Sequence, residues 1–109
     1  MAEAFKTLGQ LNPSAATLTA LYTVPALTST VVSTISVCNR SATPTVFRLS
    51  VAIAGAADNN VQYFAFDVPI GANETKWFTG GLTLATTDVL RAYALLATLT
   101  FQAWGTEIT

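Results

Sequence analysis

The chain of 109 residues contains no histidine and only one cysteine, Cys38. Without histidine no Ser-His-Asp triad can form, a cysteine nucleophile has no imidazole base, and zinc and haem lose their usual ligands. A lone cysteine cannot form an internal disulfide, which disfavours the disulfide-rich secreted class and is compatible with a reducing cytoplasm. Because Cys38 lies in a β-branched run, we predict a buried, inert thiol.

Charge is equally scarce. Five Lys and Arg residues stand against six Asp and Glu residues, 10% of the chain, where ~25% is typical. Such a chain has neither the basic face of a nucleic-acid binder nor a polybasic membrane-binding segment. No apolar run approaches the ~20 residues of a spanning helix, and the N-terminus does not read as a signal peptide. We therefore expect neither nucleic acid nor membrane as a partner.

The carboxylates that remain are scattered along the chain, whereas a glycosidase needs two of them facing each other across a cleft. The segment Asp58-Asn59-Asn60 lacks the alternating oxygens and the closing Glu of a calcium loop, and it predicts an Asx-capped turn instead. No Gly-rich phosphate-binding loop is present. The sequence therefore predicts a protein that is not an enzyme and that holds no cofactor or metal.

Threonine and alanine take the place of the missing charges. The chain has 18 Thr, 18 Ala and six Ser residues, and 51% of its residues are hydrophobic. A surface of hydroxyls and methyls carries too little repulsion to keep such a chain monomeric. We therefore expect a homo-oligomer, a trimer or a dimer, or a multi-copy position in a larger assembly.

Alternation with a period of two predicts short strands separated by turns, which is typical of a small antiparallel β-sandwich. Val89–Leu96 is predicted as a strand, with a short helix as the alternative because Ala and Leu also favour helices. We expect an all-β fold with about seven or eight strands in one domain, residues 17–109. The predicted core comprises Val31, Ile35, Val37, Phe47, Leu49, Val51, Ile53, Phe64, Phe66, Leu99 and Phe101.

Residues 1–16 stand apart, because their apolar residues are followed by the loop-like Asn12–Ala16. This segment is either an edge strand of the same sandwich or an arm that lies on a neighbouring subunit. The tryptophans near strand ends are either core residues, interface anchors or a platform for sugars, although a cluster of surface Asn, Asp and Arg beside such a platform is not evident. The candidate subunit interface comprises Phe5, Leu8, Leu11, Trp77 and Trp104.

The order of several motifs resembles a group of small virion proteins of tailed bacteriophages, over nearly the whole chain. One departure is Thr87-Asp88, where many of those proteins carry Gly-Asp, and it changes a turn residue. The motifs are Leu21–Ala26, Val37–Arg40, Phe47–Val51, Ala54–Ala57, Leu82–Leu90 and Phe101–Ile108.

This resemblance implies an immunoglobulin-like or jelly-roll β-sandwich without catalytic residues. It implies a capsid decoration, or cement, protein that binds the outer shell and stabilises contacts between capsomers. A tail, baseplate or fibre component, with or without contact to the host surface, is the alternative. The expected partners are the major capsid protein or tail proteins of the same virion, and the expected location is the virion, assembled in the host cytoplasm. A stand-alone carbohydrate-binding module is a third reading.

Overall fold

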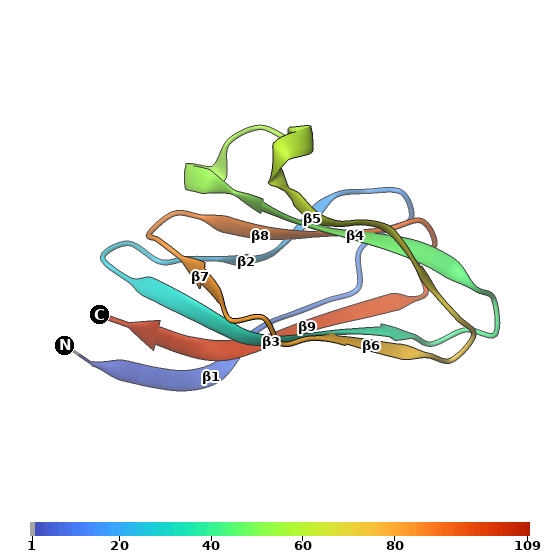
Figure 1. Cartoon of the computed structure of the whole chain (residues 1–109), viewed down its shortest axis with the longest axis horizontal. Helices are drawn as coiled ribbons and strands as arrows, with labels where there is room; N and C mark the ends of the chain where they lie inside the picture. Colours follow the sequence, from blue (N-terminus) through green and yellow to red (C-terminus); the bar gives the residue numbers. More distant parts are fainter. Residues whose placement is uncertain (1) are drawn as a thin grey trace.

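Two antiparallel sheets pack face to face in the computed structural model, which describes residues 2–109 (Figure 1). Two 3-10 turns, η1 (Ile53–Gly55) and η2 (Asn60–Gln62), lie between β4 and β5. In residues 2–109 no helix has the length and apolar character needed to cross a membrane. The strands are β1 (Glu3–Leu11), β2 (Thr19–Thr23), β3 (Ser29–Asn39), β4 (Thr45–Ala52), β5 (Tyr63–Ile70), β6 (Thr75–Phe78), β7 (Leu82–Leu84), β8 (Val89–Ala94) and β9 (Leu99–Ile108).

The strand order is that of a jelly roll. One sheet runs β1-β9-β3-β6, with the short β7 also paired to β3, and the other runs β2-β8-β4-β5. The chain crosses between the sheets after every long strand except β4, which forms a hairpin with β5. An immunoglobulin sandwich would pair its first two strands in one sheet, whereas β1 and β2 lie in different sheets. Of the two expected topologies, the chain therefore adopts the jelly roll.

The predicted all-β sandwich is confirmed, with nine strands instead of seven or eight. Residues 89–94 form a strand and not a helix. The ninth strand, β7, has only three residues after the Gly80-Gly81 turn, too few for an alternating pattern. Segment 3–11 is an edge strand, which pairs with β9 along its length.

The core lies between the sheets and draws on alternate residues of both. Phe47 at its centre makes edge-to-face contacts with Phe78 and Phe101, with ring centroids 5.9 and 6.1 Å apart. Of the predicted core, Val31 and Val51 are only half-buried, and Val51 packs against the core. The residues confirmed as buried are Ile35, Val37, Phe47, Leu49, Leu99 and Phe101.

Phe64, Phe66 and Ile53 were expected in the core and are exposed. On β5 the pairing register slips twice, between Val68 and Ala65 and again between Ala65 and Tyr63. Each slip is a β-bulge that reverses which side chains face the core, so Ala65 is buried and Phe66 points outward. Ile53 lies beyond the end of β4, in the turn η1.

A bulge on β3 determines which side chains lie on the outer face of the five-stranded sheet. Ser33 is the extra residue on β3, between Val32 paired with Gly105 and Thr34 paired with Trp104. A side chain at Gly105 would overlap the carbonyl of Val31, so only glycine fits this position. The bulge turns Val32 into the core and leaves Val31 on the outside, which corrects the predicted facing of β3.

Candidate functional site

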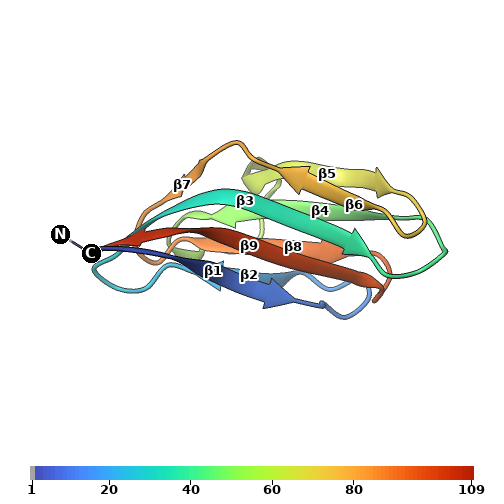
Figure 2. The same ribbon diagram turned by 90° about the horizontal axis from the view of Figure 1, so that it is seen from below.

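The outer face of the five-stranded sheet carries four cross-strand rows of uncharged residues, which we call the Trp face (Figure 2). Neighbours within a row are register partners on adjacent strands, so their side chains lie side by side. Within residues 2–109 no charged residue belongs to these rows, although Arg40 borders the last row and donates through Nε to Thr100 Oγ1 at 2.7 Å. The rows are Phe5, Thr106, Val31 and Thr83; Thr7, Trp104 and Thr34; Gln10, Gln102, Ser36 and Trp77; and Thr100, Cys38 and Thr75.

Two tryptophans stack across this face. The rings of Trp77 on β6 and Trp104 on β9 lie 6.1 Å apart between centroids and 22° from parallel. Both reach over β3, because Trp77 pairs with Ser36 and Trp104 with Thr34. Trp77 is nevertheless 62% exposed. A stacked aromatic pair, partly exposed among uncharged side chains, is the composition found at the centre of protein interfaces.

The five candidate interface residues divide into two groups. Phe5, which is 79% exposed, Trp77 and Trp104 belong to the Trp face. Leu8 and Leu11 are half-buried and pack against the protein's own core. The bulge between Thr7 and Gly9 on β1 separates the two groups along the strand. Cys38, expected to be buried, is half-buried in the last row of the Trp face.

The opposite face of the molecule carries a different chemistry. On the outer side of the four-stranded sheet, the guanidinium of Arg48 lies 4.1 Å from the ring centroid of Phe66 and 4.5 Å from that of Tyr93. Its Nε donates to Asp67 Oδ1 at 2.7 Å. Tyr63 packs edge-to-face against Phe66, with centroids 5.2 Å apart. We call these five residues the Arg48 cluster.

Local contacts raise the pKa values of two members of this cluster, Arg48 and Tyr63. The hydrogen bond to Asp67 is the largest effect that raises the pKa of Arg48. Burial, followed by the hydrogen bond that Tyr63 donates to Asp58 Oδ1 at 2.9 Å, raises the pKa of the Tyr63 phenol. Arg48 is therefore a cation already paired with an anion, and Tyr63 is a neutral donor.

No protein-family model matches the chain, and no curated protein sequence matches it.

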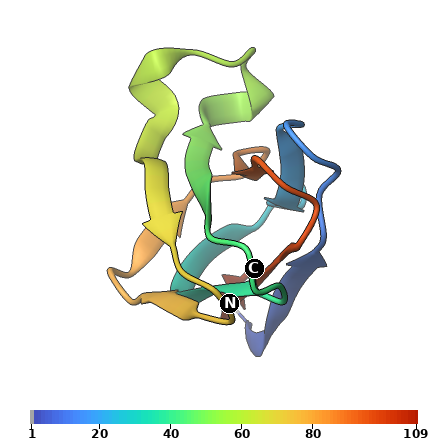
Figure 3. The same ribbon diagram turned by 90° about the vertical axis from the view of Figure 1, so that its right-hand side faces the viewer.

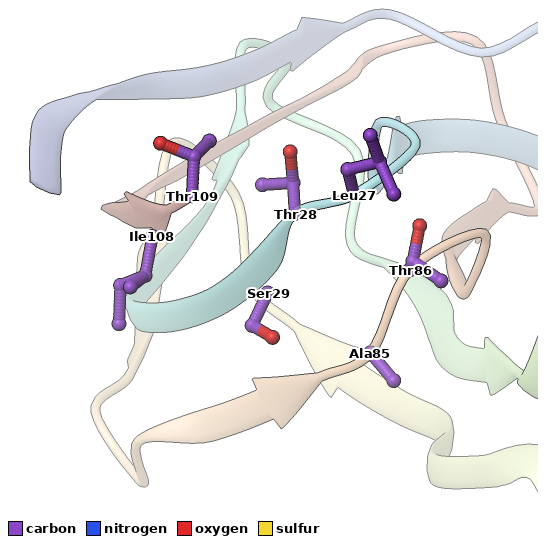
Figure 4. A pocket seen from close by; sticks show the side chains of 7 residues that line it. All are labelled: Leu27, Thr28, Ser29, Ala85, Thr86, Ile108 and Thr109. Carbon is purple, nitrogen blue, oxygen red and sulfur yellow. The ribbon is translucent and has the colours of Figure 1, made fainter. Parts of the chain in front are cut away.

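Two of the hollows on the surface lie away from the Arg48 cluster. At the end that carries the C-terminus, a hollow of about 600 Å³ lies between the β2–β3 turn, the segment after β7 and the end of β9 (Figure 4). Its side chains are hydroxyls and aliphatic groups, without a charged residue. An apolar hollow of about 210 Å³ opens between the sheets on the flank of β5 and β7, and it includes Phe64 and Phe78. The end view in Figure 3 shows that flank, opposite β1 and β2.

The carboxylates serve structural contacts in separate parts of the molecule. Asp88 accepts hydrogen bonds from two backbone amides, those of Ala54 and Ala85, at 2.9 Å each. Glu74 accepts from the amide of Gly71. Within residues 2–109, no three His, Cys, Asp or Glu side chains are grouped so as to hold a metal. The arrangement therefore offers surfaces for binding.

The Arg48 cluster was not predicted from the sequence, since its members are spread over residues 48–93. Only the β5 bulges place Phe66 beside Arg48, and a bulge has no simple signature in the alternation of residues. The alternation of β9 does place Trp104 with Thr100 and Gln102, opposite the core residues. The position of the tryptophans nevertheless remained open between core and interface, and the structure places Trp104 on the outer face.

Proposed function

We propose that the chain is a non-enzymatic structural protein of a tailed-phage virion, a capsid decoration protein that docks through its Trp face. The observation that carries this proposal is the Trp77–Trp104 stack, in which Trp77 is 62% exposed and Trp104 is half-buried, on a sheet face with uncharged rows. A specific contact needs about 800 Å² per partner, and uncharged hydroxyl and aromatic side chains cost less to remove from water than charged ones do.

Repetition strengthens such a contact. A decoration protein occupies many equivalent positions on a shell, so modest affinity per site suffices when several copies are joined. Association of the chain with itself, as a trimer or a dimer, supplies that multivalency. The jelly roll adds an analogy at the level of fold, because capsid domains are among the proteins built on it.

The alternative location is the tail, baseplate or fibre. The Arg48 cluster favours it, since exposed aromatic and polar groups on the face opposite the Trp face would point away from the docked surface. In both locations the same Trp face would contact the virion, so the docking experiment applies to both. The copy number per particle separates them, because a shell offers many more equivalent positions than a tail.

Co-sedimentation with virions that lack the protein tests the docking face. We expect Trp77→Ala and Trp104→Ala each to weaken binding by at least about tenfold, the effect of losing an interface anchor. Ile53→Ala is the control, because Ile53 is 74% exposed and lies in η1, outside the Trp face. Equal binding by all three variants would contradict the proposal.

A further inference from the structure

The Arg48 cluster borders a hollow of about 360 Å³ lined by Asn60, Tyr63 and Phe66. This volume lies in the range of small-molecule sites. Phe66 is 55% exposed although Arg48 covers part of its ring, so aromatic surface remains open to a ligand. The side-chain amide of Asn60 and the phenol of Tyr63 place polar groups at the border of that surface.

The charges around the hollow select a neutral ligand. Arg48 and Asp67 form an ion pair at 2.7 Å, so an anion finds no unpaired cation there, and the Asp58 carboxylate already accepts a hydrogen bond from the Tyr63 phenol. A neutral ligand must offer an apolar face to Phe66 and hydroxyls to the amide, the phenol and the carboxylates. A pyranose ring has both, since its axial C–H groups are attracted to the negative face of an aromatic ring and its hydroxyls donate and accept.

The hollow is also held rigid before any ligand arrives. The guanidinium of Arg48 fixes the ring of Phe66 from one side, while Asp67 holds the guanidinium through two contacts, at 2.7 and 3.4 Å. Tyr63 is held by Asp58, and η2 is held by the side chains of Asn59 and Gln62. Such preorganisation reduces the ordering cost of binding.

We propose that this hollow is a binding site for neutral pyranose sugars, with Phe66 as the stacking platform and Asn60 and Tyr63 as hydrogen-bonding groups. The site does not depend on the Trp face, which lies on the other sheet. A protein docked through one face would therefore present sugar-binding groups on the other.

Titration of the isotope-labelled full chain, followed by NMR, tests the site. The probes are the methyl glycosides of glucose, galactose, mannose and N-acetylglucosamine. We expect at least one to cause saturable shifts at the side-chain amide of Asn60, the Nε–H of Arg48 and the backbone amides of residues 60–67. Phe66→Ala should weaken that binding by at least about tenfold, and Phe66→Tyr, which keeps a ring face, should retain it.

One control variant and one further variant of the site complete the test. Leu95→Ala removes an exposed apolar side chain outside the hollow and should bind as the unaltered chain does. Asn60→Ala leaves the ring of Phe66 in place and should also weaken binding. This variant therefore tests the site even if Phe66→Ala does not fold. Absence of saturable shifts with all four glycosides, shifts confined to the Trp face, or unchanged binding by Phe66→Ala and Asn60→Ala would each overturn the proposal. Because no virion enters this experiment, its failure leaves the docking proposal intact.

Discussion

Tyr22 and Glu107 join the two sheets near the end of the molecule that carries both termini. The phenol of Tyr22 on β2 donates to Glu107 Oε2 on β9 at 2.6 Å and lies 2.7 Å from the hydroxyl of Thr30 on β3. Lys6 on β1 adds an ion pair with Glu107 at 2.7 Å. A single carboxylate thus connects three strands, and its protonation state bears on the contact between the sheets.

Stability should fall in acid through Glu107. Hydrogen bonds from Lys6 and then Tyr22 lower the pKa of this carboxyl in the folded state. Because the folded pKa lies below the unfolded value of about 4.3, the contribution is fully present above that pH and is lost as the pH falls through the folded pKa. Urea unfolding between pH 6 and 3 should show a smaller loss of unfolding free energy in Glu107→Gln; an identical slope in both proteins would contradict this role.

The loss of stability at alkaline pH should depend on Tyr22. Burial, then the hydrogen bond to Glu107, raises the pKa of its phenol to about 12. The folded pKa exceeds the unfolded value of about 10, so this contribution is complete below pH 10 and is lost as the pH rises toward 12. Tyr22→Phe should cost about 1 kcal/mol at neutral pH and should reduce the alkaline loss. Tyr63→Phe is the matched control, and a larger effect of that variant would refute the assignment to Tyr22.

Thr87 occupies a strained position, and glycine should relieve it. Its φ of 66° lies in the left-handed region, which is unfavourable for a β-branched residue. The amide of Thr87 donates to Val24 O at 3.1 Å, so the turn cannot relax freely. Thr87→Gly should raise the unfolding free energy by about 1 kcal/mol.

The neighbouring Thr86 provides the control for this turn. Its hydroxyl donates to the carbonyl of Pro25 at 2.8 Å, and its φ is not positive. Thr86→Gly should therefore destabilise the protein. Thermal unfolding of both variants measures this, with a higher melting temperature expected for Thr87→Gly and a lower one for Thr86→Gly. The turn assignment fails if both substitutions lower the melting temperature.

Two apolar residues on adjacent strands should respond very differently to alanine. Leu49 is fully buried, and Leu49→Ala should cost about 2–5 kcal/mol through lost transfer free energy and a cavity. Phe66 projects from the bulged β5 into solvent, and Phe66→Ala should cost under about 1 kcal/mol. Denaturant unfolding measures both, and a cost for Phe66→Ala as large as that for Leu49→Ala would place Phe66 back in the core.

Local pattern was sufficient for the fold class and for much of the core, because alternation reports directly on which side chains share a face. Apart from Ile53, which lies beyond the end of β4, the errors fall near bulges, where extra residues such as Ser33 and Phe64 reverse the alternation. Pairing between distant strands sets those positions, and a single strand does not contain that information. The same limit applies to the binding surfaces: the Trp77–Trp104 stack and the Arg48–Phe66 contact each join strands far apart in the chain.

The reactivity of Cys38 gives the most direct test of docking through the Trp face. Cys38 is the chain's one cysteine, and it lies on that face between Thr75 and Thr100. Intact virions and free protein are treated with a maleimide, and the labelled Cys38 peptide is quantified by mass spectrometry. A Cys38→Ser, Ile53→Cys variant reports on a site outside the Trp face. Docking predicts that Cys38 reacts in the free protein and is protected in the virion while the cysteine at position 53 reacts in both; equal labelling of Cys38 in the two states would contradict it.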